Sequence, residues 1–131
     1  MLSPIQKSLI SATAGALLYG GWGYYANSSA GTEMAMRTGI VQGSYSFVLT
    51  LSMTLLLEWG YGLLGRTRNG AIVTLAIVSG LMFSTAYALQ YFAGSEAILM
   101  TILPGYVVGT IYAATYLGAL HRSPAPTTTN D

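Results

Sequence analysis

Charged residues are scarce in this chain of 131 residues: five are Lys or Arg and four are Asp or Glu, 7% of the total. An ordinary soluble domain carries about 25% charged residues, so this chain has too few to cover a surface that faces water. With 53% hydrophobic residues and a mean hydropathy of +0.54, the composition is typical of an integral membrane protein. The net charge of +1 provides no basic stripe, which argues against nucleic-acid binding.

Cysteine is absent, and histidine occurs once, as His121. A chain without thiols forms no disulfide, binds no metal through thiolates and has no cysteine nucleophile. A single histidine does not make a catalytic metal centre either. Because the sequence also has no phosphate-binding glycine loop, nucleophile elbow or zinc-protease pair, it predicts no enzyme, no cofactor and no metal site.

Four apolar segments, separated by charged and turn residues, account for most of the chain. A helix needs about 20 apolar residues to cross a bilayer, and short connections favour antiparallel neighbours. The sequence therefore predicts an all-α integral membrane protein with four transmembrane helices in an up-and-down antiparallel bundle. The first segment is the least hydrophobic, since small and aromatic residues replace leucine in it. The predicted helices cover about 9–26, 32–64, 70–93 and 97–120 in a single membrane domain, 1–122, and 123–131 is predicted to be a disordered tail.

The positive charges in the short loops indicate the orientation, because such charges are retained in the cytoplasm. If the N-terminus is cytoplasmic, Lys7, Arg66, Arg68 and Arg122 lie on the inner side and only Arg37 lies on the outer side. This distribution predicts that both termini are cytoplasmic. The short chain with compact loops is typical of a multi-pass protein of a bacterial cell inner membrane.

Small residues recur at four-residue spacing on every predicted helix. In lipid, helices pack closely where small side chains let their backbones approach. The spacing predicts helix contacts, in the first place inside the bundle and alternatively between copies in a homo-oligomer. The residues expected to make these contacts are Ala12, Ala16, Gly20, Gly39, Gly43, Gly80, Ser84, Gly105, Gly109 and Ala113.

Pro104 and Gly105 interrupt the fourth predicted helix. Proline has no N–H, and its ring clashes with the carbonyl four residues back, so a kink near Leu103 is expected. Two interpretations stay open: the pair is a hinge, or it is a Pro–Gly pair of the kind that transmembrane helices tolerate.

Glu58 is the only carboxylate inside a predicted span. An unpaired ionised carboxylate there costs about 2.5–3.5 kcal/mol on the lenient insertion scale, so we expect Glu58 to face the bundle, to be protonated or to find a partner. Lys7 and Arg122 are the candidate ion-pair partners, and an inter-helix hydrogen bond is the structural alternative.

A stripe of polar residues leads away from Glu58 at four-residue steps along one helix face. Hydroxyl and amide groups at membrane depth either line a polar cavity or tie helices together. As a binding site for a substrate or for protons, the sequence predicts Glu58, Thr54, Thr50, Ser46, Gln42, Gln90, Tyr45, Tyr106 and Tyr112.

Two functions are compatible with these residues. The first is a small transporter, or a carrier of lipids or their headgroups, in which Glu58 is the coupling or binding carboxylate. The second is a non-catalytic membrane subunit, embedded in the lipid bilayer, that assembles with a larger membrane-protein partner through its small-residue faces.

In size and layout the chain resembles the small multidrug-resistance exporters, which are also four-helix proteins with one essential membrane carboxylate. In that family the carboxylate belongs to the first helix, whereas Glu58 lies in the second predicted helix here. The resemblance therefore assigns no role to any residue, and the sequence identifies no family.

Overall fold

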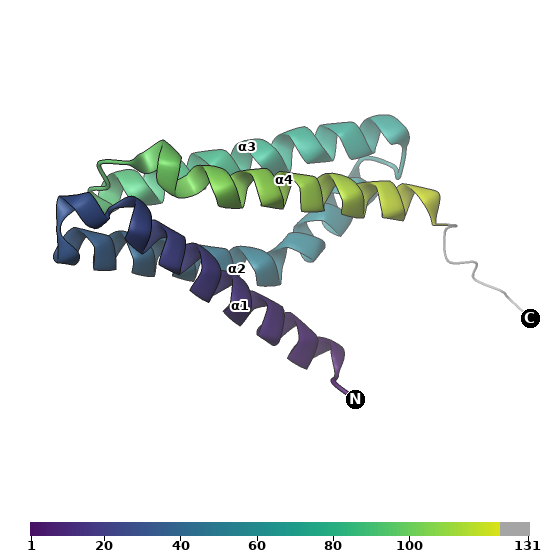
Figure 1. Ribbon diagram of the computed structural model, residues 1–131. Helices are drawn as coiled ribbons and strands as arrows, with labels where there is room; N and C mark the ends of the chain where they lie inside the picture. The colour runs from purple at the N-terminus through teal and green to yellow at the C-terminus, as the bar shows by residue number, and fades with distance from the viewer. Residues whose placement is uncertain (124–131) are drawn as a thin grey trace, which may run out of the picture.

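The computed structural model describes residues 1–123, and within that range every regular element is a helix. Consecutive long helices run antiparallel, so that the start of α1 and the end of α4 point toward the same end of the molecule (Figure 1). This confirms the all-helical prediction, while residues 124–131 of the predicted tail lie outside the described range. The elements are α1 (Pro4–Ala26), η1 (Ser28–Ala30, a short 3-10 helix), α2 (Thr32–Leu63), α3 (Arg68–Ala93) and α4 (Ile98–Arg122).

Three helices of the described range, α2, α3 and α4, are long and apolar enough to cross a membrane. α1 has 23 residues but is not one of these three, in line with its low content of leucine. Large apolar side chains cover the outer surface, among them Leu55, Ile77 and Ile111, each more than half exposed. Because such a surface is unfavourable in water, the structure is consistent with a small membrane protein. A fourth span through α1 stays a prediction.

α1 begins earlier than the expected residue 9 because polar residues start it. The Ser3 hydroxyl oxygen accepts a hydrogen bond from the Gln6 backbone N–H at 3.1 Å, and the Gln6 side-chain oxygen accepts one from the Ser3 N–H at 2.9 Å. Pro4 follows at the first helical position, where its missing N–H costs nothing. The hydropathy pattern located the apolar part of this helix and not its capped start.

Glycines allow α1 and α2 to approach closely. A Cβ atom on Gly39 would lie 2.9 Å from the Gly20 carbonyl oxygen, and one on Gly43 would lie 2.9 Å from the Ala16 carbonyl oxygen. Side-chain carbons do not approach backbone oxygens this closely, so both positions need glycine at this helix separation. Four of the residues expected to make helix contacts therefore meet at one crossing.

A hydrophobic core fills the other half of the molecule, between α2, α3 and α4. Its buried members are Met53, Leu57, Tyr61, Val78, Met82, Ala113 and Leu117.

On α3, the expectation that Gly80 and Ser84 pack inside the bundle is wrong. Both residues are exposed, and a Cβ on Gly80 would have no neighbour within 4 Å. α3 turns Val78 and Met82 inward instead, because the core between three helices needs the volume of large side chains.

A buried polar cluster closes the end of the molecule that holds the α1–α2 and α3–α4 connections. The Asn27 side-chain N–H donates to the Thr101 hydroxyl at 2.8 Å, and the Asn27 side-chain oxygen accepts from the Ser95 hydroxyl at 2.7 Å. Nearby, the Gln90 side-chain N–H donates to the Thr38 carbonyl oxygen at 3.2 Å. Because buried polar groups are costly without partners, these bonds fix the helix ends to one another.

Candidate functional site

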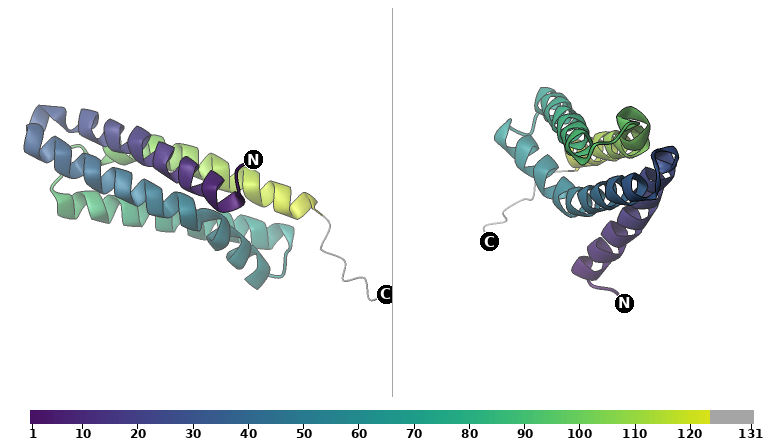
Figure 2. Two further views of the ribbon diagram at one scale, coloured as in Figure 1. Left: turned by 90° about the horizontal axis from the view of Figure 1, so that it is seen from below. Right: turned by 90° about the vertical axis from the view of Figure 1, so that its left-hand side faces the viewer.

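α1 leaves the bundle toward its N-terminus and thereby opens a cavity. Figure 1 and the right-hand view of Figure 2 show that the N-terminal half of α1 diverges from the other helices, while its C-terminal half stays packed on α2. The cavity has a volume of about 540 Å³ and is walled mainly by α1, α2 and α4. This volume lies within the ~300–1,000 Å³ range of small-molecule pockets.

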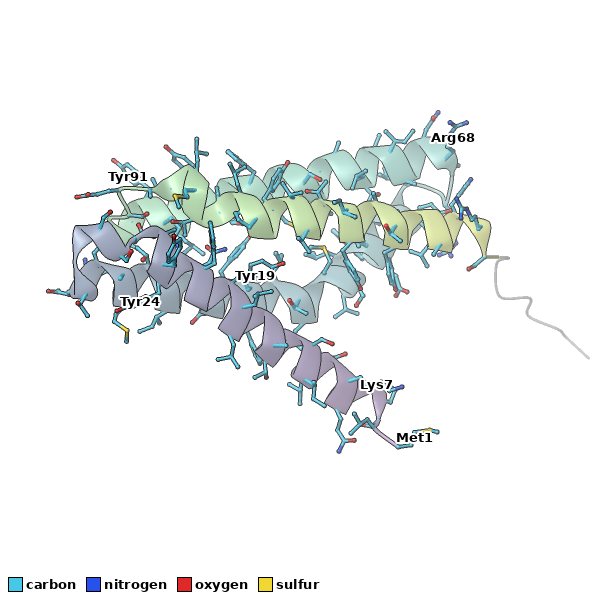
Figure 3. The ribbon with its side chains drawn as sticks, viewed as in Figure 1. Met1, Lys7, Tyr19, Tyr24, Arg68 and Tyr91 are labelled. Carbon is cyan, nitrogen blue, oxygen red and sulfur yellow. The ribbon has the colours of Figure 1, made fainter. Side chains whose placement is uncertain are left out.

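The wall from α1 consists of residues spaced three or four apart, which places them on one helix face. Lys7 and Ser11 lie toward the open end, and Gly15 and Tyr19 lie deeper. Figure 3 shows Lys7 near the start of the helix and Tyr19 directed into the space between α1 and α4. The first eleven residues of the chain are all exposed, so nothing within the described residues covers the outer part of this wall.

The wall from α2 contains most of the polar stripe that the sequence predicts. Ser46, Thr50 and Thr54 line the cavity, together with Gln42 and Tyr45. The Thr50 hydroxyl donates to the Ser46 carbonyl oxygen at 2.7 Å, and the Tyr45 hydroxyl donates to the Met82 carbonyl oxygen at 3.0 Å. Both hydroxyl protons are therefore used within the protein; the Thr50 oxygen keeps lone pairs available to a ligand, whereas the Tyr45 oxygen also lies 2.8 Å from the Thr85 hydroxyl oxygen.

The deep end of the cavity holds a pair of glutamines. Gln42 is only 3% exposed, and its side-chain oxygen accepts a hydrogen bond from the Gln90 side-chain N–H at 3.2 Å. Gln90 is fully buried behind it and does not line the cavity. Since this bond fixes the Gln42 oxygen toward α3, its amide nitrogen is left facing the cavity, and no hydrogen bond within residues 1–123 uses that nitrogen.

The wall from α4 combines glycines with tyrosines. Gly105, Tyr106, Gly109 and Tyr112 all line the cavity. The glycines leave room that a larger residue would fill, and Gly109 also packs on α3, where its Cβ position lies 3.3 Å from the Met82 sulfur. Gly105 was expected to make a helix contact, and the structure places it on the cavity wall.

Pro104 leaves one helix carbonyl without its usual partner, and Trp22 uses it. α4 continues through Pro104, but this residue has no N–H to donate to the Met100 carbonyl oxygen four positions back. The indole N–H of Trp22 donates to that oxygen at 2.8 Å, which ties α1 to α4 beside the cavity. The sequence did not predict this role of Trp22, and Pro104 is the only signal for it in the sequence. Bending at Pro104 and Gly105 stays a prediction.

Glu58 lies outside the cavity and is exposed. Its carboxylate accepts a hydrogen bond from the Tyr116 hydroxyl of α4 at 2.7 Å, and it forms no ion pair with Lys7 or Arg122 within residues 1–123. The expectation that Glu58 continues the polar stripe is wrong. Steps of four residues advance around a helix by about 40° each, so Glu58 lies about 120° from Ser46.

The charge on the cavity wall has one sign. Lys7 is the one Lys, Arg, Asp or Glu residue among the described residues that line it, and no carboxylate does. A cationic ligand would meet the Lys7 ammonium without a compensating negative group. The wall therefore favours a neutral or anionic molecule with an apolar body.

No protein-family model matches the chain, and no curated protein or solved structure is detectably similar to it.

Proposed function

We propose that this chain is a membrane carrier for a lipid-like molecule, which it binds in the cavity between α1, α2 and α4. The cavity itself is the observation that supports the proposal: about 540 Å³ of space with mostly apolar walls and a few polar groups on three helices. Binding sites for small molecules have this composition, in which apolar walls supply the area and polar groups fix the orientation.

The splayed half of α1 gives such a molecule a route from the bilayer. Leu9 and Leu18 of α1 are exposed, so the rim of the cavity is apolar. A lipid-like molecule enters between α1 and α4 without passing through water. Glu58 has no part in this proposal, because its hydrogen bond to Tyr116 lies apart from the cavity wall.

We further propose that the protein lies in a bacterial inner membrane with both termini in the cytoplasm. Four of its five basic residues, Lys7, Arg66, Arg68 and Arg122, belong to the helix ends on the side of the chain termini. Because the chain has no cysteine, single cysteines report the orientation directly. A membrane-impermeant thiol reagent applied to spheroplasts should label Ser29→Cys and leave Ser3→Cys unlabelled, and the reverse pattern would overturn this orientation.

The carrier proposal is tested by filling the cavity. A photoreactive fatty alcohol, added to the protein in lipid nanodiscs, should cross-link to residues that line the cavity. Gly105→Leu should abolish these cross-links, whereas Gly118→Leu on the same helix should keep them, because a Cβ at Gly118 meets open space. Transfer of the alcohol between vesicles should likewise be lost in Gly105→Leu and kept in Gly118→Leu. Cross-links confined to the outer surface, or equal in both variants, would refute the proposal.

One observation favours the second candidate function, a membrane subunit that assembles with a partner. Ala76, Gly80, Ser84 and Ala88 are exposed along one face of α3, which would allow another helix to approach closely. This function predicts that Gly80→Leu disrupts a complex in native membranes and that Gly105→Leu does not. Migration of the variants on a native gel tests it.

A further inference from the structure

The deep end of the cavity narrows the class of molecule that the carrier would bind, and the inference rests on the proposed function. We propose that the space between Gln42 and Gly105 is a subsite for a carbonyl oxygen at the enclosed end of a lipid-like molecule. In this arrangement the oxygen accepts a hydrogen bond from the Gln42 amide nitrogen, while the apolar remainder of the molecule extends toward the open side between α1 and α4.

The orientation of the Gln42 amide is the first argument. Gln90 donates to the Gln42 oxygen at 3.2 Å and to the Thr38 carbonyl oxygen at 3.2 Å, so Gln90 fixes which end of the Gln42 amide faces inward. The nitrogen then faces the cavity with two N–H groups and no acceptor within residues 1–123. Gln42 as a whole is only 3% exposed, so its nitrogen is a donor that no protein group uses and that a ligand in the cavity can reach, which favours a ligand with an acceptor atom.

The space beside Gly105 is the second argument. A Cβ at Gly105 would lie 3.6 Å from the Gln42 amide nitrogen and 3.5 Å from the ring of Tyr19, both ordinary contact distances. The glycine therefore leaves the cavity open in front of the unused donor, where a ligand atom can approach it. A carbonyl oxygen is a neutral acceptor of the kind that this donor can bind.

The surroundings select a neutral oxygen. Gln42, Tyr19 and Ile102 are the nearby wall residues from three helices, and none of them carries a formal charge. Lys7, the one Lys or Arg side chain on the described wall, lies twelve residues from Tyr19 along α1, or about 18 Å of helix. A charged group would therefore be stabilised at the Lys7 end and not beside Gln42.

Two photoreactive probes test the inference: a long-chain ketone and the hydrocarbon in which a methylene replaces its carbonyl group. In competition for the wild-type protein in nanodiscs, the ketone should cross-link to the cavity about fivefold more, the effect of one hydrogen bond. Gly105→Ala should remove this preference, because its methyl group fits without strain and crowds the approach of the oxygen to the Gln42 nitrogen. Gln42→Leu should remove it too, and Gly118→Ala is the matched control that should retain it.

The outcomes separate this inference from the proposal on which it rests. Equal cross-linking of both probes inside the wild-type cavity would overturn the carbonyl subsite and leave the carrier proposal standing. A ketone preference that survives in Gly105→Ala would also overturn the subsite, since the oxygen would then lie elsewhere. Cross-linking of neither probe inside the cavity would overturn both.

Discussion

The hydrogen bond from Trp22 to the Met100 carbonyl oxygen depends on Pro104, and this dependence can be measured. Pro104→Ala supplies the N–H that the helix lacks and lets α4 use the Met100 oxygen itself. The indole then competes with a helical donor for one acceptor. We therefore expect Trp22→Phe to lower the free energy of unfolding in the natural chain, and to lower it much less when Pro104 is replaced.

The magnitude follows from the kind of bond that is lost. Hydrogen bonds between membrane helices average about 0.6 kcal/mol and reach about 1.7 kcal/mol. The Trp22 bond is short, at 2.8 Å, and its acceptor has no helical partner, so we expect a value near 1 kcal/mol. Trp22→Phe also changes packing, but this part cancels in a double-mutant cycle. The expected coupling between Trp22 and Pro104 is thus about 1 kcal/mol.

The assay is reversible unfolding in lipid bicelles of four proteins: the natural chain, Trp22→Phe, Pro104→Ala and the double variant. Helix content followed by circular dichroism gives the free energy of unfolding for each. If the residues are coupled, the change in unfolding free energy of the double variant should differ from the sum of the two single changes by more than the ~0.3–0.5 kcal/mol that independent sites show. Additivity within that limit would refute the reasoning that Pro104 reserves the Met100 oxygen for Trp22.

The same unfolding assay checks two further expectations. Gly43→Ala should lower the free energy of unfolding by about 1–3 kcal/mol, because its Cβ would lie 2.9 Å from a backbone oxygen of α1. In the control Gly21→Ala, the Cβ meets open space, and the free energy of unfolding should stay within ~0.5 kcal/mol. Equal effects of the two substitutions would contradict the glycine crossing. Asn27→Leu should cost about 1–3 kcal/mol, since it removes three buried side-chain hydrogen bonds, and an unchanged stability would contradict the role of the polar cluster. Glu58→Gln should leave cross-linking of the fatty alcohol unchanged, because an amide oxygen can still accept from Tyr116 outside the cavity; loss of cross-linking in a folded variant would return Glu58 to the site.

The helical architecture could be predicted from the sequence because apolar runs and small-residue spacing reflect forces that act along one helix. The glycines at positions 20, 39 and 43 are informative for the same reason, since close backbone approach needs them whichever helix is the partner. The identical spacing on α3, with Gly80 and Ser84, faces outward. Small residues at this spacing indicate that a helix face allows close approach, but they do not indicate which neighbour packs on that face.

The site was predicted in part, and the errors have a geometric cause. Ser46, Thr50 and Thr54 still reach the cavity because two steps of four residues turn the direction by about 80°, while a third step, to about 120°, takes Glu58 away from it. The cavity itself exists because α1 diverges from α4, which depends on where two helices cross. Pairings between distant residues, such as Trp22 with Met100, cannot be read from a local pattern.

Asn27 also has a consequence for the order in which the molecule is made. Its partners Ser95 and Thr101 follow it by 68 and 74 residues, so they are synthesised only after the first hairpin of two helices is complete. The hairpin can form early through its glycines, because synthesis proceeds from the N-terminus. The Asn27 side chain, however, reaches its full set of partners only when the second hairpin docks against the first. Docking of the second hairpin therefore adds two of the three side-chain hydrogen bonds of Asn27, and a chain released after the first hairpin would keep only the bond to the Gly23 carbonyl oxygen.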